Sequence, residues 1–146
     1  MTRFVLDASV ALRWFLSNPL PAYARQVRRL MLDGARARVP ALWHLEMANG
    51  LAVAERRGVL AAADVEASLS EIERLLGQAI ETDPALVSAR QALATARAFR
   101  LSGYDAVYLE LARREHLPLA TLDDELRAAA LRAGVVRLQS SLQLGS

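Results

Sequence analysis

The sequence predicts one α/β domain of 146 residues, in which helices cover both faces of a small parallel β-sheet. Short apolar segments alternate along the chain with longer segments of helical periodicity. Strands that are separated by helices pair in parallel through crossover connections, so this alternation predicts a parallel sheet. The 28 alanines and 26 leucines favour helix. Because no repeat or linker divides residues 1–146, we assign all of them to a single domain.

The first predicted strand is Phe4-Val5-Leu6, an apolar run that ends at Asp7, a residue type common at helix starts. Asn18-Pro19 interrupts the helix that follows, and Gly34 and Gly58 end two later helices. Up to residue 81, the expected strands are 4–6, 38–40 and 79–81, and the expected helices are 10–16, 21–32, 41–57 and 62–76.

In the second half of the chain, Asp83-Pro84 combines a helix cap with a proline suited to the first helical turn. Ser102-Gly103 opens the next helix, and Gly134 separates a final helix from an apolar run. The expected helices here are 84–99, 104–115 and 123–132, and the expected strands are 117–120 and 135–138.

The composition excludes several kinds of chemistry. The chain has no cysteine, which rules out disulfides, thiolate metal sites and a cysteine nucleophile. All 18 basic residues are arginine, so a lysine-dependent phosphate loop and a Schiff-base lysine are also excluded. No targeting segment is visible, and no apolar run approaches the ~20 residues of a membrane-spanning helix. We therefore expect a cytoplasmic protein that does not bind a membrane.

Four carboxylates occupy positions unlike those of the other acids, which mostly suit a solvated helix surface. Asp7 and Asp123 each follow a predicted strand, so both should lie where open parallel sheets bind ligands, at the carboxyl ends of the strands. Asp105 lies in the first turn of a predicted helix. Glu46 lies mid-helix, on a stripe that we expect to face the core and that also contains Leu42, Leu45, Asn49, Ala52 and Val53.

Each acid also has a purely structural interpretation. The three aspartates could cap helices or favour the positive helix end. Glu46 has no capping role, and its structural alternative is a partly exposed edge position. One shared site explains all four positions together, whereas the structural interpretation needs a separate explanation for each.

The four segments that contain these acids resemble the acidic motifs of PIN-domain ribonucleases. The match is closest to the VapC toxins of bacterial toxin–antitoxin pairs, and it covers nearly the whole chain in family-like order and spacing. The segments are Phe4-Val5-Leu6-Asp7-Ala8-Ser9, Pro40-Ala41-Leu42-Trp43-His44-Leu45-Glu46-Met47-Ala48-Asn49, Tyr104-Asp105-Ala106 and Ala120-Thr121-Leu122-Asp123.

The resemblance implies that four acids bind the metal and act in catalysis, namely Asp7, Glu46, Asp105 and Asp123. In the last motif, Thr121 and Leu126 also match when Asp123, rather than Asp124, is taken as the acid. Clustered carboxylates without a nearby lysine repel one another, and a hard divalent cation relieves that repulsion. Oxygen ligands suit Mg²⁺ or Mn²⁺ rather than zinc.

Three further side chains are candidates for supporting roles at this site. Ser9 and Thr121 match hydroxyl positions of the motifs and would contact metal-bound water or phosphate. Asn49 would hold Glu46 or the substrate. Each of the three has a structural alternative, which is helix capping for the hydroxyls and a buried polar contact for the amide.

Four basic side chains are left with open roles. His44 projects off the expected core stripe of its helix, so we expect it on the surface. Three arginines share one helical face, where a solvated surface is the default interpretation and contact with RNA phosphates is the alternative. They are Arg25, Arg28 and Arg29.

By resemblance, the protein is expected to be a metal-dependent endoribonuclease toxin that a cognate antitoxin inhibits, in a family that tends to form homodimers. Metal-activated water would cut looped or single-stranded RNA, with transfer or ribosomal RNA as the implied substrates. Two alternatives stay open. One is a small-phosphoester phosphohydrolase, although Ser9 stands where haloacid-dehalogenase-like enzymes have a second aspartate. The other is a non-catalytic module whose acids dock a basic partner segment.

Overall fold

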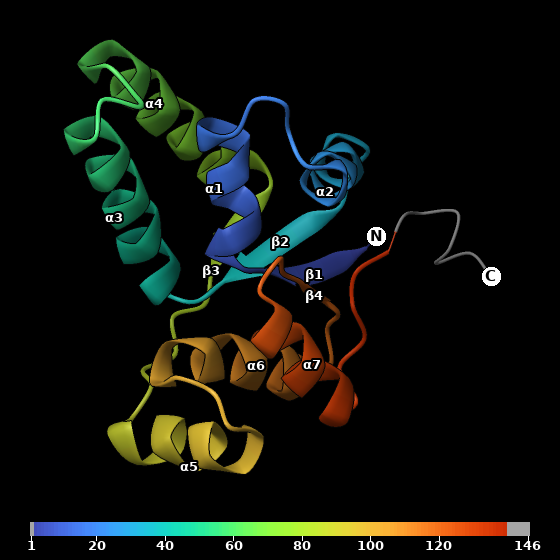
Figure 1. Cartoon of the computed structure of the whole chain (residues 1–146). Coiled ribbons are helices and arrows are strands. Elements are labelled where there is room, and N and C mark those ends of the chain that lie inside the picture. Colours follow the sequence, from blue (N-terminus) through green and yellow to red (C-terminus); the bar gives the residue numbers. More distant parts are fainter. Residues whose placement is uncertain (1, 140–146) are drawn as a thin grey trace.

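A computed structural model describes residues 2–139, which form four strands and seven helices (Figure 1). In chain order these are β1 (Arg3–Leu6), α1 (Ala8–Leu16), α2 (Ala22–Leu32), β2 (Arg36–Val39), α3 (Leu42–Arg56), α4 (Ala62–Gln78), β3 (Ile80–Thr82), α5 (Ala89–Phe99), α6 (Gly103–Glu115), β4 (Leu119–Ala120) and α7 (Asp124–Arg132). Residues 1 and 140–146, which we also assigned to the domain, lie outside the described range. No helix in residues 2–139 combines the length and the apolar character needed to cross a membrane.

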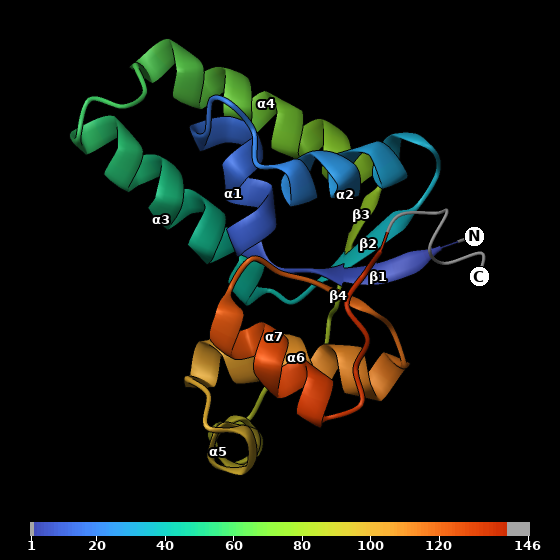
Figure 2. The same ribbon diagram turned by 45° about the vertical axis from the view of Figure 1, so that its right-hand side comes forward.

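All four strands pair in parallel, in the spatial order β3-β2-β1-β4. Phe4 of β1 aligns with Ala37 of β2, and Leu6 of β1 aligns with Ala120 of β4. Helices α1 to α4 lie on one side of the sheet and α5 to α7 on the other (Figures 1 and 2). Because helices cover both faces, residues 4–6 of β1 are completely buried. The predicted α/β class is therefore confirmed.

The helix predicted for residues 84–99 begins later than expected, at Ala89. Ser88 caps it, because the Ser88 hydroxyl accepts a hydrogen bond from the Gln91 amide at 3.1 Å. Asp83 cannot act as the cap. Its amide donates to the Val39 carbonyl at 2.8 Å, which prolongs the pairing of β3 with β2 instead of starting a helix.

The strand predicted for residues 135–138 is reduced to a single bridge between Leu119 and Arg137. Two backbone hydrogen bonds with Leu119 form this bridge, and Tyr23 of α2 also holds the segment. The Tyr23 hydroxyl donates to the Leu138 carbonyl at 2.9 Å, and the Arg137 guanidinium lies 3.7 Å from the centre of the Tyr23 ring. This stacking distance is typical of a cation–π contact.

The buried face of α3 is not the stripe that we predicted. Trp43, Met47 and Leu51 are buried, whereas Leu45 is 70% exposed. The helix packs mainly against α1 and α4, beside the sheet (Figure 1). Exposed alanines give the opposite face a similar apolar character, so periodicity alone could not distinguish the two stripes. Glu46 is consequently half-buried at the border of the core.

An ion-pair network centred on the buried side chains of Arg38 and Asp83 joins β2 to the ends of β3 and α6. Arg38 of β2 contacts Glu115 through two nitrogens, Nε at 3.0 Å and Nη2 at 2.6 Å. Its Nη1 lies 2.8 Å from Glu81, and its Nη2 lies 3.4 Å from Asp83, whose other oxygen contacts Arg114 at 2.6 Å. Hydrogen bonding to Arg38 lowers the pKa of Glu115. A buried charge with several partners becomes costly when one partner is removed.

We predict that the substitution Arg38→Met destabilises the fold by about 3 kcal/mol at pH 7, because Asp83 and Glu115 lose their shared cation. Since the pKa of Glu115 is lowered in the folded state, its contribution is present above pH 4.5 and is lost as the pH falls further. The difference between variant and wild type should therefore shrink in acid. Urea unfolding at several pH values measures this difference in the free energy of unfolding.

The control for this experiment is Arg74→Met, which removes an exposed ion pair with Glu71 on α4. Exposed pairs contribute little, so the unfolding midpoint of this variant should stay close to that of wild type. Equal stability of Arg38→Met and wild type at pH 7 would contradict the structural role of the network.

Candidate metal centre

Asp7 and Thr121 meet where β1 and β4 end. The Asp7 amide donates to the Ala120 carbonyl at 3.0 Å, which continues the pairing of the two strands by one residue. The Thr121 hydroxyl donates to Asp7 Oδ2 at 2.7 Å. Both side chains are buried, with 4% of Asp7 and 1% of Thr121 exposed. Strand pairing therefore brings together two residues that are far apart in the sequence.

The hydroxyl of Ser9, at the start of α1, donates to the same carboxylate oxygen, Asp7 Oδ2, at 2.6 Å. Backbone amides set the direction of both hydroxyls. The Ser9 oxygen accepts from the Leu122 amide at 2.9 Å, and the Thr121 oxygen accepts from the Asp123 amide at 3.0 Å. Both hydroxyls therefore donate to the same oxygen, Asp7 Oδ2, and the two hydroxyl oxygens lie 3.3 Å from each other.

Helix capping does not explain Asp7. The residue stands at the N-terminal cap position of α1, but its side chain makes no capping hydrogen bond, and its bond from this helix comes from the Ser9 hydroxyl. Burial raises the pKa of the Asp7 carboxyl, and repulsion from Asp123 raises it further, whereas the bonds from Ser9 and Thr121 lower it. The pKa of Asp7 is raised overall, which means that its surroundings destabilise the ionised carboxylate relative to the protonated form.

Asp123 caps α7 with one of its two oxygens. Its Oδ1 accepts from the Leu126 amide at 2.8 Å, so the capping interpretation is correct for this residue. The second oxygen has no hydrogen-bond donor in the described part of the chain. The neighbouring Asp124 side chain is 86% exposed and pairs with Arg127. Of this adjacent pair, Asp123 is the residue whose charge raises the pKa of Asp7.

Glu46 is held by Tyr108, a residue outside the four acidic motifs that the sequence suggested. The hydroxyl of Tyr108 on α6 donates to Glu46 Oε1 at 2.6 Å. Burial and repulsion from Asp7 raise the pKa of Glu46, while this hydrogen bond lowers it. Burial, followed by the charges of Asp7 and Glu46, raises the pKa of Tyr108. Tyr108 lies three residues after Asp105, on the same face of a helix, and that spacing could have indicated it.

Asp105 is the least constrained of the four acids. It lies in the first turn of α6, where its amide donates to the capping hydroxyl of Ser102 at 3.1 Å. Its carboxylate accepts no hydrogen bond from any residue in the described range. Burial raises the pKa of Asp105 to about 6, and the other contributions come from the charges of Asp123, Asp7, Glu46 and Glu125. The four predicted acids are therefore close enough to repel one another, and Glu125 is a further acid nearby.

The other sequence candidates lie at the edge of this group or outside it. Asn49 is exposed, and its side chain makes no hydrogen bond to Glu46 or to any other described residue. His44 is not free on the surface, because its Nε2 lies 2.8 Å from the Thr82 hydroxyl and the residue is half-buried. The arginines that share a face of α2 are all exposed, namely Arg25, Arg28 and Arg29.

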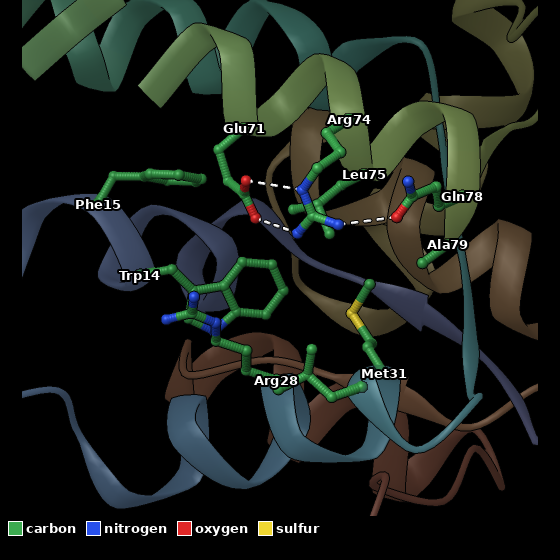
Figure 3. A pocket seen from close by; sticks show the side chains of 10 residues that line it. Trp14, Phe15, Arg28, Met31, Glu71, Arg74, Leu75, Gln78 and Ala79 are labelled. Carbon is green, nitrogen blue, oxygen red and sulfur yellow. Dashed lines mark hydrogen bonds and ion pairs between the residues drawn. The ribbon is translucent and has the colours of Figure 1, made fainter. Parts of the chain in front are cut away.

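A cavity of about 270 Å³ lies apart from the acids, between α1, α2 and α4 (Figure 3). Its walls include the apolar side chains of Trp14, Phe15 and Met31. On α4, Arg74 Nε donates to Glu71 Oε2 at 2.9 Å across the rim of the cavity. None of the four acids lines it. This cavity and the candidate metal centre are thus different places.

The donor set suits a hard divalent cation. Glu46 and Asp123 each use one oxygen in a hydrogen bond to the protein and leave the other without a described donor, and Asp105 leaves both. Asp7 takes both of its hydroxyl donors on one oxygen, Oδ2. All these ligand atoms are oxygens, which Mg²⁺ and Mn²⁺ prefer. Within residues 2–139, no three acidic or histidine side chains already form a cage that could hold a metal ion. Binding would require the side chains to move closer together.

Comparison with known proteins identifies the family. The family model described as PIN domain matches residues 4–131. PAE2754 from Pyrobaculum aerophilum is 25% identical, with a TM-score of 0.63 over 93% of this chain and 83% of that chain. FitAcB from Neisseria gonorrhoeae is 19% identical, with a TM-score of 0.64 over 93% of this chain and 96% of that chain.

A third similar structure is that of VapBC2 from Rickettsia felis, which is bound to a DNA fragment from the VapBC2 promoter. It is 12% identical, with a TM-score of 0.57 over 94% of this chain and 98% of that chain. No curated protein sequence matches the chain. The family match covers most of the sequence, and it includes the four segments that bring the acids together at one edge of the sheet. The chain therefore belongs to the PIN domain family.

Proposed function

We propose that this protein is a metal-dependent endoribonuclease and the toxin of a toxin–antitoxin pair. The observation that carries the proposal is that four segments of a PIN domain place mutually repelling acids at one edge of the sheet: Asp7, Glu46, Asp105 and Asp123. PIN domains are typically nucleases and generally use divalent metal ions. The motif resemblance to VapC toxins and the structural similarity to VapBC2 support the toxin assignment.

The four acids would hold Mg²⁺ or Mn²⁺ through the oxygens that the protein leaves free. When bound, such an ion lowers the pKa of a water ligand and stabilises the leaving oxygen of the phosphodiester. The chain's own residues orient the acids. Ser9 and Thr121 fix Asp7, the first turn of α7 fixes Asp123, and Asp105 stays free to adjust. Hydrolysis by activated water needs no protein nucleophile, which agrees with a chain that has no cysteine.

The proposed substrate is single-stranded or looped RNA, such as a loop of transfer or ribosomal RNA. A net charge of +2 provides little basic surface for a long duplex. Carboxylates and a divalent ion do not distinguish RNA from DNA, so contacts to the 2′-hydroxyl and to unstacked bases would make that choice. By family resemblance, the protein would act in the cytoplasm as a homodimer, and a cognate antitoxin would inhibit it.

We predict that removing the charge of any of the four acids lowers RNA cleavage by about 100-fold or more, because each would be a direct metal ligand. The variants are Asp7→Asn, Glu46→Gln, Asp105→Asn and Asp123→Asn. The matched control is Asp124→Asn, whose side chain faces solvent and which should cut at the wild-type rate. A labelled RNA incubated with Mg²⁺ measures all five rates. Full activity of Asp105→Asn would refute the four-acid site.

Asp105 should make the metal-free protein less stable as the pH rises. Its pKa is about 6 in the folded state, against 3.8 as the ordinary value. A raised carboxyl pKa gives stability that is complete below pH 3.8 and is lost as the pH rises through 6. In EDTA at pH 7.5, Asp105→Asn should therefore be more stable than wild type by about 1 kcal/mol, after allowing for partial exposure of the side chain.

At pH 4, wild type and Asp105→Asn should have the same Tm. At pH 7.5, Mn²⁺ should raise the Tm of wild type more than that of the variant. Thermal melts followed by circular dichroism test both statements. A variant that melts below wild type in EDTA at pH 7.5 would instead indicate that Asp105 has only a structural role at the start of α6.

The chemistry of the cut ends provides a separate test of the mechanism. Attack by activated water should leave a 3′-hydroxyl, whereas attack by the RNA's own 2′ oxygen leaves a 2′,3′-cyclic phosphate. Mass spectrometry of the products distinguishes the two. Cyclic phosphate ends, or undiminished cutting in excess EDTA, would contradict the proposed mechanism.

A further inference from the structure

We infer that Tyr108 is a positioning residue of the candidate metal centre, which fixes one oxygen of Glu46 so that the other stays available to a cation. The inference rests on the proposed function. The evidence is a hydrogen bond of 2.6 Å from the Tyr108 hydroxyl to Glu46 Oε1, which joins α6 to α3 across 62 residues of sequence. Within residues 2–139, this hydroxyl is the only hydrogen-bond donor to the Glu46 carboxylate.

Glu46 needs such a partner more than the two aspartates at the strand ends do. Asp7 has two hydroxyl donors, and Asp123 has a free amide at the start of α7. Glu46 lies in the middle of α3, where the backbone amides are already bonded within the helix. Its longer side chain also loses more rotamer freedom when it is ordered. Without Tyr108, the carboxylate would have several positions at the half-exposed border of the core.

Tyr108 is well placed to provide a fixed donor. Its side chain is completely buried, so packing holds the ring and the position of the hydroxyl with it. The same helix contains Asp105 one turn earlier, and Arg38 anchors the far end of that helix through Glu115. One rigid helix therefore presents one acid of the site and orients a second.

The competing explanation is that a buried phenol simply needs an acceptor and that Glu46 supplies it. The two explanations differ in what Tyr108→Phe does to metal binding. The probe is Mn²⁺ alone, with free Mn²⁺ measured by electron paramagnetic resonance. We expect Tyr108→Phe to weaken Mn²⁺ binding by about 10-fold or more, as loss of a partner that orients a metal ligand usually does.

The matched control is Tyr23→Phe, which removes a tyrosine hydrogen bond of 2.9 Å to the Leu138 carbonyl, away from the acids. Both variants should lose some thermal stability, but only Tyr108→Phe should lose Mn²⁺ affinity. If Tyr108→Phe melts lower than wild type and binds Mn²⁺ with the wild-type Kd, the bond is merely structural and the inference is wrong.

A double-mutant cycle tests whether Tyr108 acts through Glu46. In a Glu46→Gln background, Tyr108→Phe should cause no further loss of Mn²⁺ affinity, because the ligand that it positions is already gone. Equal losses in both backgrounds would overturn the inference.

Wild type offers a test that does not depend on the folding of any variant at Tyr108. In a titration with Mg²⁺, the ¹³Cζ resonance of Tyr108 should shift and that of Tyr23 should not, and an unmoved Tyr108 resonance would also overturn it.

Failure of this inference and failure of the proposed function give different results. Wild type that binds no Mn²⁺ and cuts no RNA would end the proposed function itself. Wild type whose Mn²⁺ binding is abolished by Asp7→Asn but unaffected by Tyr108→Phe would keep the metal centre and contradict only the role of Tyr108.

Discussion

The pairing of β1 with β4 is the contact on which the rest of the site depends. The bond from the Asp7 amide to the Ala120 carbonyl sets the two strand ends side by side, and α1 and α7 then start from the same edge. Ser9 lies in the first turn of α1 and Asp123 caps α7, so both lie at this edge. A shift of one residue in this register would turn every side chain of the strand to the opposite face. The apolar residues that bury β1 therefore also decide where the acids meet.

The sequence was sufficient to predict the fold class and the residues at which β1 and β4 end, but not the contacts between distant helices. Asp7 follows a fully apolar run, so its place at the edge of the sheet could be predicted from local pattern. The buried face of α3 could not, because its alanines make two stripes look alike and packing against α1 and α4 selects one of them. Tyr108 and Arg38 act across 62 and 77 residues of sequence, a range at which periodicity gives no information.

Two groups of carboxylates in this fold have pKa values that are shifted in opposite directions. Around Arg38, hydrogen bonding and ion pairing lower the pKa of Glu115, so the charged form is the stable one there. At the edge of the sheet, burial and mutual repulsion raise the pKa values of Asp7, Glu46 and Asp105. The first arrangement stabilises the native state by itself. The second is costly while the carboxylates are charged, and a bound cation would offset that cost; raised carboxyl pKa values are frequent at functional sites.

The outward orientation of Asp124 has a practical consequence. Its side chain is 86% exposed, directly beside Asp123 in the sequence, and it pairs with Arg127 on the surface of α7. The chain contains no cysteine and no lysine. A single cysteine introduced at this position would thus be the only thiol in the molecule, and a fluorescent or spin label attached to it would report on the acidic edge from one residue away.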